Sequence, residues 1–234
     1  MKKRWNMLLL AATLFYVPFI KAQDDVTTLV KKISDRLDKV NDYEASGKMK
    51  TNVTFLKVPE STVKIYFKKP NKLKIRNEKG ISFVPKGAVS INLSNILNGN
   101  KYSIIDAGTD KIGNTTVRVV KLLPEDDNAE VVLSTLYIDE NNLVIKRAKT
   151  TTRENGSYQL EMTYGKYIAY GLPDKINFTF NTKDYKLPKG ITFDFDDGTT
   201  PPKTAADDAK KNKGMAEITF YSYNINKGVA DSMF

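Results

Sequence analysis

Carboxylates, lysines and hydroxyls are the side chains left for acid–base or metal chemistry, because the 234-residue chain contains no histidine and no cysteine. Ser-His-Asp and Cys-His catalysis and almost every zinc or copper site are therefore excluded. The acidic group at 194–197 precedes a glycine, as in a calcium loop, but Ala205 stands where that loop needs a bidentate glutamate. Asp126 and Asp127 sit in an evident turn. No motif supports lysine or carboxylate catalysis, so we predict a binding protein with no catalytic residue, metal or cofactor.

The spacing of the apolar side chains is more informative. Over residues 26–40 they recur every three or four positions with lysines and aspartates opposite, which predicts an amphipathic helix. After Asn41 the period becomes two, which predicts strands with one apolar face. The first such residues are Val63, Ile65, Phe67, Leu73 and Ile75. Something must cover that face, and what covers it bears on function.

Further β-rich segments follow, separated by glycine, asparagine and aspartate, with a good turn at 139–142. They lie at 80–84, 101–106, 117–122, 131–138, 143–150, 158–164, 176–180, 191–195 and 216–223, and a helical turn is expected at 94–97. About ten strands with one helix predict a mainly β (α+β) fold, a large twisted antiparallel sheet or partial barrel. A single helix is too narrow to cover its whole apolar face.

The first 22 residues have the three-part pattern of a signal peptide. A basic start at 2–4 precedes an apolar stretch at 7–20, and Ala22 ends a cleavage site before Gln23. The stretch is too short and too interrupted to span a bilayer well, and an uncleaved anchor is the alternative. We predict an exported protein cleaved after Ala22, with a single domain at 23–234 that contains a polar loop at 196–214.

Much of the positive charge belongs to that first segment. Without its four basic residues, 33 basic and 27 acidic residues remain, so the formal charge falls from +10 to +6. The remaining lysines are spread along predicted solvent-facing strand positions, which argues against nucleic-acid binding. With no cysteine, an exported domain of this size depends on its apolar core rather than on disulfides.

Several short motifs occur in a recognisable order. They lie at 33–40 and 43–46, at 66–73, at 123–124, at 136–139, and at 177–180 followed by 188–192. In this order, behind a signal peptide, they resemble the periplasmic outer-membrane lipoprotein carrier (LolA-like) family over about residues 29–195. The resemblance implies an incomplete β-barrel in the periplasm whose apolar concave face, covered by the helix and small lid helices, holds the acyl chains of a lipoprotein.

The resemblance also implies partners: acylated lipoproteins, an inner-membrane release complex and an outer-membrane acceptor, with the carrier itself a monomer. The family has an arginine before the proline of the third motif, and this chain has Lys69 before Pro70. We expect Lys69 to contact the lid or a membrane partner. Lysine lacks the planar guanidinium fork, which weakens the case for a lid-locking hydrogen bond. The chain also continues for 42 residues past Thr192. We expect residues 196–234 to shape specificity or docking rather than the cavity, with Tyr221 and Tyr223 at the sheet's rim.

The candidate cavity residues are apolar and take alternating strand positions. They are Met49, Val53, Ile65, Phe67, Leu73, Ile75, Leu160, Met162 and Phe178. Burying an acyl chain of about 16 carbons is worth roughly 12 kcal/mol, so such a cargo needs a large apolar receptor. Each of these residues could equally belong to an ordinary core, but a sheet this broad with so few helices favours a cavity.

Two functions from different classes are compatible with these features. The first is a carrier chaperone that escorts lipoproteins towards the outer membrane. The alternative is a non-catalytic periplasmic module on the same fold that senses a lipid. A transmembrane β-barrel fits less well, because its strands would be unusually rich in lysine. Carrier and sensor differ in whether apolar cargo leaves the inner membrane with the protein.

Overall fold

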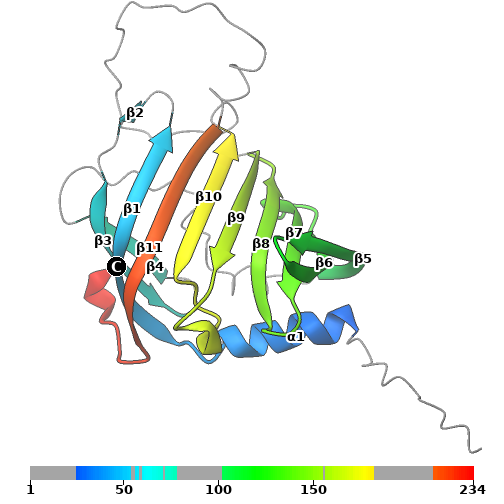
Figure 1. The fold of residues 1–234 in the computed structure, drawn as a ribbon, viewed down its shortest axis with the longest axis horizontal. Coiled ribbons are helices and arrows are strands. Elements are labelled where there is room, and N and C mark those ends of the chain that lie inside the picture. Colours follow the sequence, from blue (N-terminus) through cyan, green and yellow to red (C-terminus); the bar gives the residue numbers. More distant parts are fainter. Residues whose placement is uncertain are drawn as a thin grey trace, which may run out of the picture.

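The computed structural model describes residues 25–53, 56–57, 60–70, 72–77, 102–154, 156–181 and 213–234 (Figure 1). They form the helix α1 (Val26–Leu37), the 3-10 turns η1 (Ile168–Tyr170) and η2 (Asp231–Met233), and eleven strands. The strands are β1 (Asp42–Val53), β2 (Leu56–Lys57), β3 (Ser61–Lys68), β4 (Lys72–Asn77), β5 (Tyr102–Ile112), β6 (Thr115–Pro124), β7 (Val131–Asp139), β8 (Val144–Thr152), β9 (Ser157–Thr163), β10 (Lys175–Asn181) and β11 (Lys213–Ile225).

The strands form one antiparallel sheet in the order β4-β3-β1-β11-β10-β9-β8-β7-β6-β5, with β2 paired to the end of β1. The order ends at β4 on one side and β5 on the other, so the sheet is an incomplete barrel, as predicted. α1 runs across the strands at one end of the sheet (Figure 1). Within the described ranges, no helix is long and apolar enough to cross a membrane, and no histidine, cysteine or carboxylate side chains gather as metal ligands would.

α1 forms where its period predicts, but it is shorter. The Asp25 side chain caps its start by accepting a hydrogen bond from the Thr27 N–H at 3.2 Å, and an exposed Lys31–Asp35 pair supports the solvent side. Its buried residues are Val26, Leu29, Val30, Ile33 and Leu37. The helix ends before Val40, which instead packs against β1 and β3 in a second apolar cluster.

The strand β11 corrects one expectation about the C-terminal segment. It lies between β1 and β10, in the interior of the sheet, and pairs with both (Figure 1). Gly47 of β1 makes this close pairing possible, because a Cβ there would lie 2.5 Å from the Thr219 carbonyl oxygen. β11 adds to the sheet, as expected, but it does so in the interior, and Tyr223 is buried there rather than placed at the rim. Sequence spacing could not show this, because β1 and β11 lie about 170 residues apart.

Most predicted strands are confirmed with shifts of one or two residues at their ends, and the turn at 139–142 joins β7 to β8. β5 runs to Ile112, further than expected. Other predictions lie outside the described residues: the signal peptide, the strands at 80–84 and 191–195, the turn at 94–97, the acidic group at 194–197, and the polar loop up to 212.

Candidate ligand-binding cavity

The apolar face of the sheet divides into two clusters. The first lies under α1 and joins its buried face to inward side chains of β6, β7, β8, β9 and β10, such as Leu136, Leu160 and Phe178. The second lies beside the end of α1, on β1, β3 and β11, and includes Ile65 and Phe67. The helix covers only the first cluster, so the second cluster is where an apolar opening can form.

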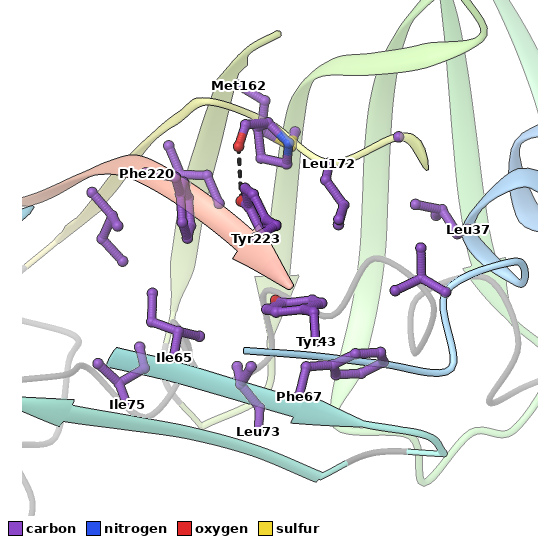
Figure 2. Close-up of a pocket in the computed structure, with 15 residues that line it drawn as sticks. Leu37, Tyr43, Ile65, Phe67, Leu73, Ile75, Met162, Leu172, Phe220 and Tyr223 are labelled. Carbon is purple, nitrogen blue, oxygen red and sulfur yellow. Dashed lines mark hydrogen bonds between the residues drawn. The ribbon is translucent and has the colours of Figure 1, made fainter. Parts of the chain in front are cut away.

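A cavity of about 70 Å³ lies mainly in the second cluster and reaches Leu37, Met162 and Ile176 of the first (Figure 2). It is bounded by the end of α1, by the inner faces of β3, β4 and β11, and by the loop at 171–173. Its lining residues are Leu37, Val40, Tyr43, Ile65, Phe67, Leu73, Ile75, Met162, Gly171, Leu172, Pro173, Ile176, Ile218, Phe220 and Tyr223. None of them is charged, so the cavity suits an apolar ligand and offers no acid–base group.

Aromatic rings form one side of this cavity. Tyr223 stacks on Phe220 with ring centroids 4.9 Å apart and meets Tyr43 edge-on at 5.3 Å. A β-bulge explains how Phe220 and Tyr223 share a face, since in a regular strand residues three apart point to opposite sides. The register shifts opposite Gly47, and Tyr221, left without a partner on β1, is 58% exposed.

The two tyrosine hydroxyls of the cavity, those of Tyr43 and Tyr223, differ in their hydrogen bonds. The Tyr223 hydroxyl donates to the Pro173 carbonyl oxygen at 2.8 Å (Figure 2). The Tyr43 hydroxyl makes no hydrogen bond within the described part of the chain. Burial raises the pKa of both phenols, so both stay neutral at physiological pH. Tyr43 therefore presents a neutral donor in an otherwise apolar cavity, a group suited to a ligand carbonyl.

Lys69, at the end of β3, lies against the end of α1. Its Nζ is 2.5 Å from the Asp38 carbonyl oxygen and 2.9 Å from Asp38 Oδ1, and Asp38 is the C-terminal cap of the helix. A cation at this end of a helix meets both its free carbonyls and the negative end of its dipole. On its other side, Arg36 donates to the Asn142 carbonyl oxygen in the β7–β8 turn. The helix end that borders the cavity is thus fixed at two points.

The structure separates the predicted site residues into groups. Ile65, Phe67, Leu73, Ile75 and Met162 line the cavity. Leu160 and Phe178 are 0% and 1% exposed in the cluster under α1, and Met49 is buried in the second cluster without lining the cavity. Val53 belongs to β1, but its side chain lies outside the described residues.

The expectation that residues 196–234 do not shape the cavity is wrong for β11, because Ile218, Phe220 and Tyr223 line it. Sequence reasoning also missed the lining residues of the loop at 171–173. Ile218 and Phe220 carried a signal, because they alternate with polar residues in a strand already predicted. Placing them in the cavity required the pairing of β11 with β1. Leu172 carried no periodic signal, since it follows the turn η1.

A second, wider hollow of about 770 Å³ lies near the ends of β7, β8, β9 and β10. Threonines, a serine, a glutamine and Lys149 make up much of its lining. Such a wall keeps its hydrogen bonds to water and gains little from an acyl chain. The smaller cavity is the better candidate for an apolar ligand.

Comparison with known proteins identifies the fold. No protein-family model and no curated protein matches the sequence. Among solved structures, the chain is similar to a domain described as an outer membrane lipoprotein-sorting protein from Vibrio parahaemolyticus (TM-score 0.55, 10% identity, 88% of this chain and 94% of that one). It is also similar to a DUF1329 family protein from Desulfovibrio piger (0.57, 12%, 91% and 98%) and to a LolA superfamily protein from Nitrosomonas europaea (0.51, 8%, 88% and 96%). The chain therefore has the LolA-like fold that its motifs predicted.

Proposed function

We propose that this protein is a periplasmic carrier that holds the acyl chains of lipoproteins in the cavity beside α1 and escorts them towards the outer membrane. The observation that carries the proposal is the uncharged cavity in the part of the sheet that α1 leaves uncovered. The LolA-like fold supports it, because one similar structure is described as a lipoprotein-sorting domain. An inner-membrane release complex and an outer-membrane acceptor would be its partners, and it would act as a monomer.

The cavity is narrow in this structure. Its volume of about 70 Å³ is well below the roughly 300–1,000 Å³ of typical small-molecule pockets. An acyl chain therefore requires the walls to move apart. Burial of about 16 carbons releases roughly 12 kcal/mol, enough to displace a wall held by a few surface contacts.

Lys69 restrains one movable wall. By binding Asp38 it holds the end of α1, and with it Leu37 and Val40, at the edge of the cavity. We infer that this contact favours the narrow form of the cavity. Where the family has an arginine with a forked guanidinium group, this chain has Lys69. Its single ammonium group reaches both the carbonyl oxygen and a carboxylate oxygen of Asp38.

Residues 1–22 would direct export, and cleavage after Ala22 would release a mature chain starting at Gln23. The intact mass of the protein recovered from periplasm measures this directly. A periplasmic species that still carries residues 1–22 would instead indicate an anchored protein.

The cavity is tested with binding of a fluorescent C16 fatty acid to the exported protein. Leu73→Glu and Ile75→Glu place a charge in the cavity wall and should weaken binding at least tenfold, because the carboxylate resists burial beside an acyl chain. Ile105→Glu is the matched control, since Ile105 is 45% exposed on the far edge strand β5. Wild-type affinity in both cavity variants, with only stability lowered, would make these side chains core.

Carrier and sensor are separated by a transfer assay. Inner-membrane vesicles loaded with a lipoprotein are incubated with the protein, and the soluble fraction is analysed by mass spectrometry. A carrier appears there in a one-to-one complex with the acylated protein and passes it to outer-membrane vesicles. A sensor binds the fatty acid but leaves the lipoprotein in the first vesicles.

A further inference from the structure

Strand β4 is the wall of the cavity with the weakest support from the sheet. It stands at the end of the strand order and pairs with β3 on one side. Leu73 and Ile75 point inward and line the cavity, while Lys72, Lys74 and Arg76 alternate with them on the outer face. β1, β3 and β11 have strand partners on both sides, whereas β4 has a partner on one side among the described strands, so β4 is the wall that can move at the smallest cost.

The outer face of β4 is held by the last four residues of the chain. Lys72 Nζ lies 2.8 Å from Asp231 Oδ1, Lys74 Nζ lies 3.1 Å from the Phe234 main-chain oxygen, and Arg76 donates to the Met233 carbonyl oxygen at 3.3 Å. Lys68 of β3 adds a second contact to Asp231 at 3.1 Å. Lys72 also lies over the Phe234 ring, 5.8 Å from its centroid.

The segment leading to these residues is anchored elsewhere. After β11, the Asn226 Oδ1 accepts from the Asn41 N–H at 2.7 Å, and Asp42 Oδ1 accepts from the Gly228 N–H at 2.9 Å. Val229 is buried. The chain then reaches the β3 side of the sheet (Figure 1). Residues 231–234 thus connect a fixed point on the sheet interior to its outermost strand.

We propose that residues 231–234 are a latch that holds β4 closed over the cavity and that must yield when the cavity widens for a ligand. The proposal rests on the proposed function, since it takes this cavity as the ligand site. Each inward residue of β4 named above touches the cavity and each outward one touches the latch, so the two sites act on the same strand. A ligand that displaces β4 and a latch that holds it therefore oppose each other, and by linkage each weakens the other.

The first test measures the latch without ligand. Hydrogen exchange of the backbone amides of β4 is compared with that of β8 in wild type, in a variant lacking residues 231–234, and in Asp231→Asn. We expect exchange in β4 to be at least tenfold faster in the truncated protein and about two- to fivefold faster in Asp231→Asn, the range for exposed ion pairs. Exchange in β8 should not change. Ser232→Ala, at an exposed position inside the latch, is the matched control.

Unchanged β4 exchange in the truncated protein would overturn the proposal. If that protein does not fold, Asp231→Asn decides alone, because it removes the carboxylate charge and keeps the size of the side chain.

The second test measures the coupling between the latch and ligand binding, with the fluorescent C16 fatty acid as the ligand. Removal of the latch should lower the dissociation constant of the fatty acid by the same factor by which it raises the hydrogen-exchange rate of the β4 amides. Faster exchange with an unchanged dissociation constant would show that β4 does not move on binding and would refute the latch. Faster exchange in a protein that binds no fatty acid in any variant would refute the proposed function and leave only the restraint on β4.

Discussion

The two halves of the apolar face are built from the same strand pattern and differ in what covers them. Under α1, Leu160 and Phe178 are completely enclosed, whereas Leu73 and Ile75 on β4 are only half-buried and border the cavity. In both halves, apolar residues alternate with polar ones along the strands. The comparison shows that alternation decides which face is apolar, while the cover decides whether that face becomes core or binding site.

The extent of the cover follows from simple dimensions. A helix of 12 residues is about 18 Å long, whereas ten strands at about 4.8 Å spacing extend for roughly 43 Å. One such helix covers less than half of the sheet. The sequence predicted this mismatch, but it did not tell which half stays open.

The largest expected difference between the halves is in stability. Phe178→Ala removes a ring from a closely packed core and should lower the free energy of unfolding by about 3–5 kcal/mol. Ile75→Ala enlarges a space that already exists beside an edge strand and should cost at most about 1.5 kcal/mol. Urea unfolding of both variants measures the contrast. Equal losses would show that the cavity half is packed as tightly as the other.

Much of the fold could be predicted, because the helix and most strands are encoded by local periodicity. Periodicity predicted which side chains face inward, but it could not tell those that line the cavity from those that belong to the core. Ile65 and Leu160 have the same chemistry and the same spacing, and their fates depend on where α1 ends and on what lies opposite. Phe220 and Tyr223 reach the cavity through long-range pairing and a bulge, neither of which leaves a local pattern.

The seam between β1 and β11, inside the cavity half, should be the next most sensitive place. Gly47→Ala puts a methyl group 2.5 Å from the Thr219 carbonyl oxygen, so the strands must separate, at a cost of about 1–3 kcal/mol. Ser46→Ala, next to it, loses one exposed hydrogen bond to Ser222 and should cost less than about 1 kcal/mol. Thermal unfolding distinguishes the two, and an unaffected Gly47→Ala would mean that the seam can adjust.

Lys69 should affect the cavity half far more in function than in stability. Lys69→Leu loses a partly exposed ion pair and a helix-end contact, worth about 1 kcal/mol or less. Because the narrow form of the cavity loses this support, cargo should bind a few-fold more tightly and leave more slowly. Lys121→Leu, at an exposed position on β6, is the control. Release kinetics identical to wild type would make Lys69 an ordinary surface charge.

The smallest expected effect is a pH dependence of the latch, confined to the cavity half. Hydrogen bonds from Lys72 and Lys68 lower the pKa of Asp231 below its ordinary value of 3.8. A carboxylate with a lowered pKa stabilises the folded state above that ordinary value, and the contribution disappears as the pH falls through the pKa in the folded protein. Protection of β4 amides relative to β8 should therefore be constant from neutral pH down to about 4 and decline below it. Asp231 is exposed, so the decline should be slight and should vanish at high salt, because exposed charges are screened. Asp231→Asn should show no decline, and a decline that persists in this variant would assign the titration to another group.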